Sequence, residues 1–131
     1  MEISSLHDYY ICLGSNYNAR KNIKRVEKWI ESEFSVAFFG RIIRTKGIDV
    51  DFECWYLNQV VRIKSSLDID TMNRKLKAEE RDVGRIHNDK RVAIDIDIVK
   101  YDGVVVHKKF DEFYFLSMLC DELEQSEIKQ K

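Results

Sequence analysis

The chain has 131 residues, of which 44% are hydrophobic and 34% charged, and its formal net charge is −1. This composition indicates one globular domain, residues 1–131, and argues against a bulk-charge nucleic-acid binder, which normally carries a clear basic excess. No apolar run approaches the roughly 20 residues that span a bilayer, and the three cysteines form no CxxC pair, so we expect a cytoplasmic protein without nucleic-acid or membrane partners. The oligomeric state stays open.

The first half of the chain predicts three strands and one helix. The apolar run Tyr9–Leu13 reads as a strand that ends in the turn Gly14-Ser15-Asn16. Asn18 is a candidate N-cap of a helix, in which Ile23, Val26, Trp29 and Ile30 recur at helical spacings. Residues 34–45 and 55–63 then predict two strands that pair antiparallel through the loop between them.

The second half predicts a helix, a hairpin and a last helix. Asp70 is the expected N-cap of the helix, and Gly84 its expected end. After a polar loop over 85–91, a strand is expected over 92–101. Asp102-Gly103 is a turn signal before a returning strand over 104–106. Residues 110–123 predict the last helix, with a frayed tail over 124–131.

This order of elements predicts an α+β fold of the ferredoxin-like, βαββαβ sandwich type. The antiparallel sheet is expected to carry its helices on one face and to leave the other face for ligands, with a short hairpin and a C-terminal helix added.

The alternating segment 94–98 carries the most chemical information. Neighbouring side chains of a strand point to opposite faces, so Ile94, Ile96 and Ile98 should share the core face and Asp95 and Asp97 the other. Two adjacent carboxylates repel each other, and Mg²⁺, which binds carboxylate and phosphate oxygens, would compensate them. The alternative is an exposed strand face that is merely acidic.

Other residues near this segment suit a polyphosphate or a flat ring. Arg85, Lys90 and Arg91 precede the acidic strand and could hold phosphate, although a solvated loop is the simpler reading of any one of them. Tyr56 and Asn58 share one strand face and could bracket a heterocycle, or form an ordinary half-buried pair. No GxGxxG, P-loop, GxSxG or HExxH motif is present.

Several segments, taken together and in order, resemble one family. They are the "LGSN" of Leu13–Asn16, the "RT" of Arg44-Thr45, the strand Tyr56–Val61, the spacing of Glu80 to Gly84-Arg85, and the acidic strand Ile94–Ile98. This set is similar to that of the 6-hydroxymethyl-7,8-dihydropterin pyrophosphokinases of folate biosynthesis, and the similarity extends over roughly residues 9–115.

The resemblance implies an ATP-dependent diphosphotransferase with two Mg²⁺ ions. Asp95 and Asp97 would hold the metal and, with Arg85, form the catalytic set. The pterin would lie between Tyr56 and Phe115, with Asn58 and Thr45 reading its edge. Five positions match the nucleotide site: Glu80, Arg85, Arg91, Ile98 and His107.

The differences from the family pattern fall on the nucleotide side. Thr45 is followed by Lys46-Gly47-Ile48 without proline, the second arginine of the "GRxR" element is His87, and an arginine expected near the last helix aligns with Phe113. These differences leave a non-catalytic pterin- or nucleotide-binding relative as the alternative. A purely structural or interaction protein is a further one, because a fold alone does not set function.

Overall fold

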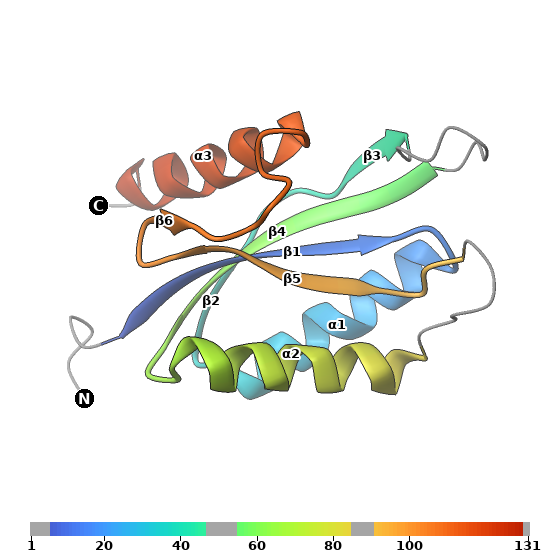
Figure 1. Ribbon diagram of the computed structural model, residues 1–131, viewed down its shortest axis with the longest axis horizontal. Helices are drawn as coiled ribbons and strands as arrows, with labels where there is room; N and C mark the ends of the chain where they lie inside the picture. Colours follow the sequence, from blue (N-terminus) through green and yellow to red (C-terminus); the bar gives the residue numbers. More distant parts are fainter. Residues whose placement is uncertain (1–5, 47–54, 85–90, 130–131) are drawn as a thin grey trace.

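The computed structural model describes residues 6–46, 55–84 and 91–129, with side chains to residue 126 (Figure 1). In chain order the elements are β1 (His7–Ser15), α1 (Ala19–Glu33), β2 (Val36–Phe39), β3 (Ile43–Lys46), β4 (Trp55–Ser65), α2 (Ile69–Val83), β5 (Asp95–Tyr101), β6 (Val104–Val105) and α3 (Tyr114–Lys129). Within those ranges, no helix combines the length and the apolarity needed to cross a bilayer.

The six strands form one antiparallel sheet in the order β2-β4-β1-β5-β6, with β3 also paired to β4. This α+β arrangement is consistent with the ferredoxin-like type. α1 and α2 lie on one face of the sheet and α3 on the other (Figure 1). The expectation of helices on one face therefore holds for α1 and α2 only, and α3 covers part of the face that we expected to be left for ligands.

Each face of the sheet has its own apolar core because the strand side chains alternate. Tyr9, Ile11 and Leu13 of β1 pack with α1 and α2, whereas Tyr10 packs under α3. The helices contribute Ile23, Val26, Ile30, Met72 and Leu76 to the first core, and Leu116, Leu119, Cys120 and Leu123 to the second. Ile94 and Ile96 are fully buried in the first core, which confirms the predicted inward face of the acidic strand.

The helix ends differ from prediction in two places. α2 begins two residues earlier than expected, because Asp68 rather than Asp70 is its N-cap and accepts a hydrogen bond from Thr71 N (2.8 Å). Its predicted end is confirmed, since Gly84 adopts the left-handed conformation at φ 102°. The predicted last helix is confirmed, but α3 begins at Tyr114 and continues to Lys129, so its expected start at 110 and the expected frayed tail from 124 were wrong.

The strand expected over 34–45 is split into β2 and β3. The break lies at Gly40, whose N–H donates to Val60 O (2.9 Å). A Cβ at this position would lie 2.7 Å from the same carbonyl oxygen, so only glycine allows the two backbones to come this close. Beyond the break, β3 pairs antiparallel with the first residues of β4, from Ile43 with Asn58 to Lys46 with Trp55.

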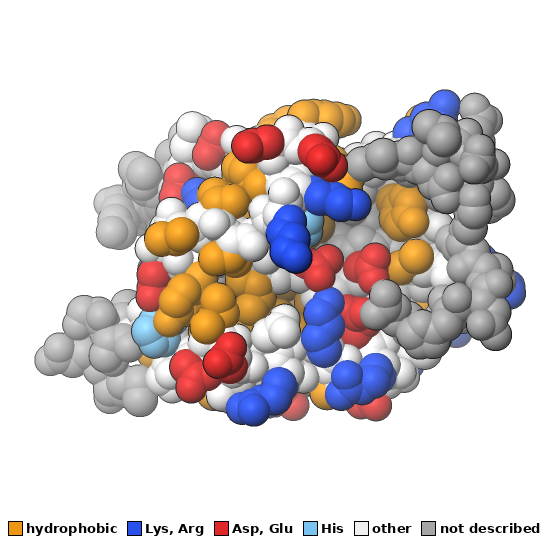
Figure 2. Space-filling view, in the orientation of Figure 1, with side chains coloured by type: hydrophobic (Ala, Val, Ile, Leu, Met, Phe, Trp, Pro, Cys, Tyr) orange, Lys and Arg blue, Asp and Glu red, His pale blue; other side chains and the backbone are white. Residues whose placement is uncertain are grey.

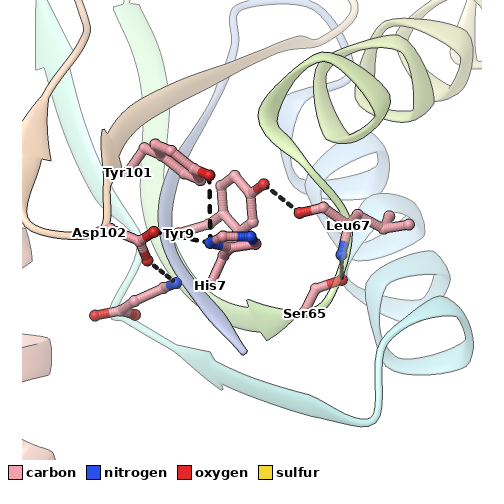
Figure 3. Close-up of polar contacts among 7 residues, drawn as sticks. His7, Tyr9, Ser65, Leu67, Tyr101 and Asp102 are labelled. Carbon is pink, nitrogen blue, oxygen red and sulfur yellow. Dashed lines mark hydrogen bonds and ion pairs between the residues drawn. The ribbon is translucent and has the colours of Figure 1, made fainter. Parts of the chain in front are cut away.

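The turn between β5 and β6 is tied to the start of β1 by side chains (Figure 3). Asp102, at φ 48°, accepts hydrogen bonds from Asp8 N (2.8 Å) and pairs with His7 Nδ1 (2.8 Å). The Tyr101 hydroxyl lies 3.2 Å from the same His7 nitrogen, and the Tyr9 hydroxyl donates to Leu67 O (2.6 Å). These contacts fix the distal end of β5, the strand that carries the acidic pair.

Candidate active site

A cavity of about 330 Å³ lies between the sheet and the start of α3. Its floor comes from four neighbouring strands, and its wall comes from α3 and the segment before it. The lining residues are Cys12, Gly14, Thr45, Lys46, Tyr56, Asn58, Asp95, Asp97, His107, Lys109, Phe113, Phe115 and Leu116. The cavity is therefore built mainly on paired strands, which hold side chains more rigidly than loops do.

The floor of the cavity is ordered by the strand register. Gly14 of β1 pairs with Asn58 of β4 on one side and with Asp95 of β5 on the other. One step along β1, on the same face, Cys12 pairs with Asp97. An amide and a carboxylate thus flank a position without a side chain. The glycine leaves room for a ligand directly between them.

One side of the cavity suits a flat polar heterocycle. The Asn58 side chain is 6% exposed, and its Nδ2 donates to Thr45 Oγ1, which fixes the amide and leaves its oxygen toward Gly14. Phe115, which is 8% exposed, stacks on Phe113 with ring centroids 5.5 Å apart. Aromatic walls with a fixed amide are a common way to bind a ring and read its edge.

A second cavity of about 650 Å³ adjoins the first. The two share Asp95, Asp97, His107, Lys109 and Phe113, so the acidic pair stands on the boundary between them. Figure 2 shows acidic side chains near the middle of this face with basic side chains close by. His107 Nδ1 accepts a hydrogen bond from Lys109 N (3.0 Å), which fixes this imidazole at the rim.

Lys77 of α2 connects the acidic pair to the helix layer. Its Nζ donates to Asp97 Oδ1 (2.9 Å), Glu80 Oε2 (2.9 Å) and Ile96 O (2.7 Å). Burial lowers the pKa of this ammonium, but its hydrogen bonds with Glu80 and Asp97 outweigh burial, so the pKa is raised. Lys77 is therefore charged at neutral pH and already offsets part of the negative charge of the pair.

The donor set fits Mg²⁺ shared with a bound polyphosphate. Asp95 and Asp97 offer carboxylate oxygens to the same cavities and stay partly exposed. Among the described residues, no group of three or more potential ligands stands ready to hold a metal. Proteins usually bind Mg²⁺ through only one or two carboxylates, and water and substrate phosphates fill its remaining coordination positions.

The structure brings most of the predicted site residues together. Thr45, Tyr56, Asn58, Asp95, Asp97, His107 and Phe115 line the first cavity, and Ile98 lines the second. Glu80 lies behind β5 at 2% exposure, where its carboxylate also accepts from Ile96 N (3.1 Å). Arg91 is exposed and stacks over the Tyr17 ring (5.0 Å). Arg85, with His87 and Lys90, lies outside the described residues.

Sequence reasoning missed several residues of the site, four of which bear on its chemistry. Lys77 had no motif to mark it, and only the packing of α2 on β5 brings it to Asp97. Lys109 and Phe113 could have been found from the cationic and aromatic run after His107. Cys12, which belongs to the apolar run that predicted the first strand, lines the cavity beside Asp97, and burial raises the pKa of its thiol, as does the nearby Asp97.

Comparison with protein families identifies one family for this chain. The family model described as 7,8-dihydro-6-hydroxymethylpterin-pyrophosphokinase (HPPK) matches residues 10–125. A search of curated proteins found no match. The matched segment includes every described residue that lines the two cavities.

Proposed function

Because the chain belongs to the 7,8-dihydro-6-hydroxymethylpterin-pyrophosphokinase family, we propose that it transfers diphosphate from ATP to 6-hydroxymethyl-7,8-dihydropterin in a Mg²⁺-dependent reaction. The family implies a pyrophosphokinase of folate biosynthesis that uses ATP as co-substrate and Mg²⁺. The proposal for this chain adds the acceptor, the products and the residues that act.

The observation that carries the proposal is the position of the acidic pair between two cavities. Asp95 and Asp97 line both the smaller cavity, with its amide and aromatic walls, and the larger one, with His107 and Lys109. A pterin in the first cavity and a triphosphate in the second would meet at the carboxylates. This is the arrangement that transfer between the two substrates requires, because positioning supplies much of the rate in such reactions.

On the pterin side, recognition would rest on Asn58, Tyr56 and Phe115. The Asn58 amide, oriented by Thr45, would hydrogen-bond the polar edge of the ring, and the two aromatic side chains would cover its faces. The hydroxymethyl group would then extend past Gly14 toward Asp95, because Gly14 is paired with both strands and adds no side chain between them.

In the reaction itself, the hydroxymethyl oxygen bonds to the β-phosphorus of ATP. The bond from this phosphorus to the α,β-bridging oxygen breaks, AMP leaves, and the hydroxyl proton passes to solvent. Mg²⁺ held by Asp95 and Asp97 would neutralise the charge on the phosphate oxygens. Lys109, at the rim of both cavities, would add positive charge beside the phosphates. Arg85, Arg91 and His107 remain candidates for phosphate contacts, and Glu80 and Ile98 for the nucleotide.

The test is AMP formation from ATP and Mg²⁺, with and without the pterin. We expect AMP only when the pterin is present, and we expect loss of at least about 100-fold in Asp95→Asn or Asp97→Asn, in line with the loss of one charge-stabilising group. Asp121→Asn, an exposed aspartate on α3 outside both cavities, is the matched control. A folded protein that forms no AMP, or an Asp95→Asn/Asp97→Asn variant with wild-type turnover, would refute the proposal.

A further inference from the structure

The ammonium of Lys77 is bound to a carboxylate oxygen that we expect to coordinate a metal ion. Its Nζ lies 2.9 Å from Asp97 Oδ1, which is one of the two oxygens that this side chain could offer to a cation. The carboxylate is 43% exposed and the lysine side chain 32% exposed, so the pair lies at the boundary of the site and can separate without unfolding anything.

Lys77 has two further partners that would hold it in place after such a separation. Glu80, at 2% exposure, accepts from it at 2.9 Å, and the carbonyl of Ile96 accepts at 2.7 Å. An ammonium has three hydrogens, and here all three are used. If the bond to Asp97 is lost, the two others still place the charge within the same small region.

From this geometry we infer that Lys77 is a built-in counter-ion that competes with divalent metal for Asp97. The inference rests on the proposed function only in taking Asp95 and Asp97 as the metal ligands. While Lys77 holds Asp97, one oxygen of this carboxylate and part of its charge are engaged by the ammonium and are not offered to an entering cation. Metal alone then binds weakly, and it binds well only with the additional oxygens of a polyphosphate. Lys77 is a positioning residue in this sense, since it acts through Asp97.

The experiment is a titration of the free protein with Mn²⁺, without ATP or pterin, in which the electron paramagnetic resonance signal of unbound Mn²⁺ is followed. Mn²⁺ prefers the same oxygen ligands as Mg²⁺. In Lys77→Met we expect binding about two- to fivefold tighter than in wild type, the range for loss of one partly exposed ion pair. A purely structural role of Lys77 predicts the opposite, because a disturbed β5 would bind metal less well.

Two controls separate this effect from a general change of charge. Lys75→Met removes the same charge from the same helix, but Lys75 pairs with Glu33 (3.0 Å) and not with the site, so its Mn²⁺ affinity should stay at the wild-type value. In Lys77→Met/Asp97→Asn the gain should disappear, because it depends on Asp97. Lys77→Gln serves as a second variant, and thermal melting checks that each protein is folded.

The outcomes decide the inference independently of catalysis. Tighter Mn²⁺ binding in Lys77→Met alone supports it, even if the protein forms no AMP. It is overturned by unchanged or weaker binding in both folded Lys77 variants, by an equal gain in Lys75→Met, or by the absence of Mn²⁺ binding at millimolar concentration in every variant.

Discussion

Substitution of Gly14 by alanine tests whether the space between Asn58 and Asp95 belongs to a ligand. A Cβ at Gly14 would lie 3.1 Å from Asn58 Oδ1, closer than ordinary van der Waals contact, and the amide would have to move by a few tenths of an ångström. Asn58 cannot move freely, because it is buried and bonded to Thr45. The methyl group would therefore displace the amide that we expect to read the pterin edge.

The expected effect is a loss of affinity with little loss of stability. Accommodating an extra methyl group in such a tight place typically costs about 1–3 kcal/mol of stability. Replacing glycine by alanine at an unstrained position gains about 0.4–1 kcal/mol, because it lowers the conformational entropy of the unfolded chain. We therefore expect the free energy of unfolding of Gly14→Ala to fall by at most about 2.6 kcal/mol. Pterin affinity should fall about tenfold, which corresponds to about 1.4 kcal/mol, or one neutral hydrogen bond.

The assay is a fluorescence titration with the pterin, combined with urea unfolding. Gly103→Ala is the matched control, since its φ of +84° makes alanine strained although no atom lies within 4 Å of the added Cβ. That variant should lose stability and keep wild-type pterin affinity. Gly14→Ala with unchanged affinity would refute the reasoning, and so would a loss of stability that accounts for all of its loss of binding.

Three further changes follow from contacts described above. Phe115→Ala should lower the free energy of unfolding in urea by about 3–5 kcal/mol and remove pterin binding. Tyr114→Ala is the control, because this side chain is 72% exposed and should tolerate the change. Equal effects of the two substitutions would contradict the assignment of Phe115 to the cavity wall. Arg62→Met should lower the free energy of unfolding by about 2–4 kcal/mol, because the 27%-exposed Asp8 carboxylate loses its bidentate partner. In a double-mutant cycle, Asp8→Asn/Arg62→Met should recover part of the lost stability, because no unpaired carboxylate remains. Hydrogen bonds from Asp8 N and His7 lower the pKa of Asp102, so its contribution to stability is present above the ordinary carboxyl pKa and is lost as pH falls through the depressed value. Asp102→Asn should accordingly reduce Tm at pH 7, and its difference from wild type should shrink as pH falls below the ordinary carboxyl pKa; a pH-independent difference would exclude this account.

Local patterns were sufficient to predict the parts of the molecule that depend on local chemistry. The alternation over 94–98 predicted which side chains of β5 face the core, and Gly84 predicted where α2 ends, because both follow from backbone geometry. Asp68 and Asp70 are equally good capping residues in composition, and only the position of the helix on the sheet separates them.

Features that depend on packing between distant segments could not be predicted in this way. Lys77 reaches Asp97 across 20 positions of the sequence, through the angle at which α2 lies on β5. The placement of α3 over the second face depends on apolar residues of three strands meeting one helix. Pattern analysis identifies an amphipathic helix, but it does not tell which face of a sheet the helix covers.

The two α2 side chains beside the acidic pair also protect the sheet from other chains. β6 pairs only with Lys100 and Tyr101, so the part of β5 that carries Asp95 and Asp97 would otherwise be an open edge. Both main-chain groups of Ile96 are instead satisfied by α2, the N–H by Glu80 and the carbonyl by Lys77. An uncovered strand of this kind is a template for intermolecular pairing and aggregation. Variants of Lys77 or Glu80 should therefore be tested for self-association as well as for catalysis, since these two side chains affect both solubility and the acidic pair.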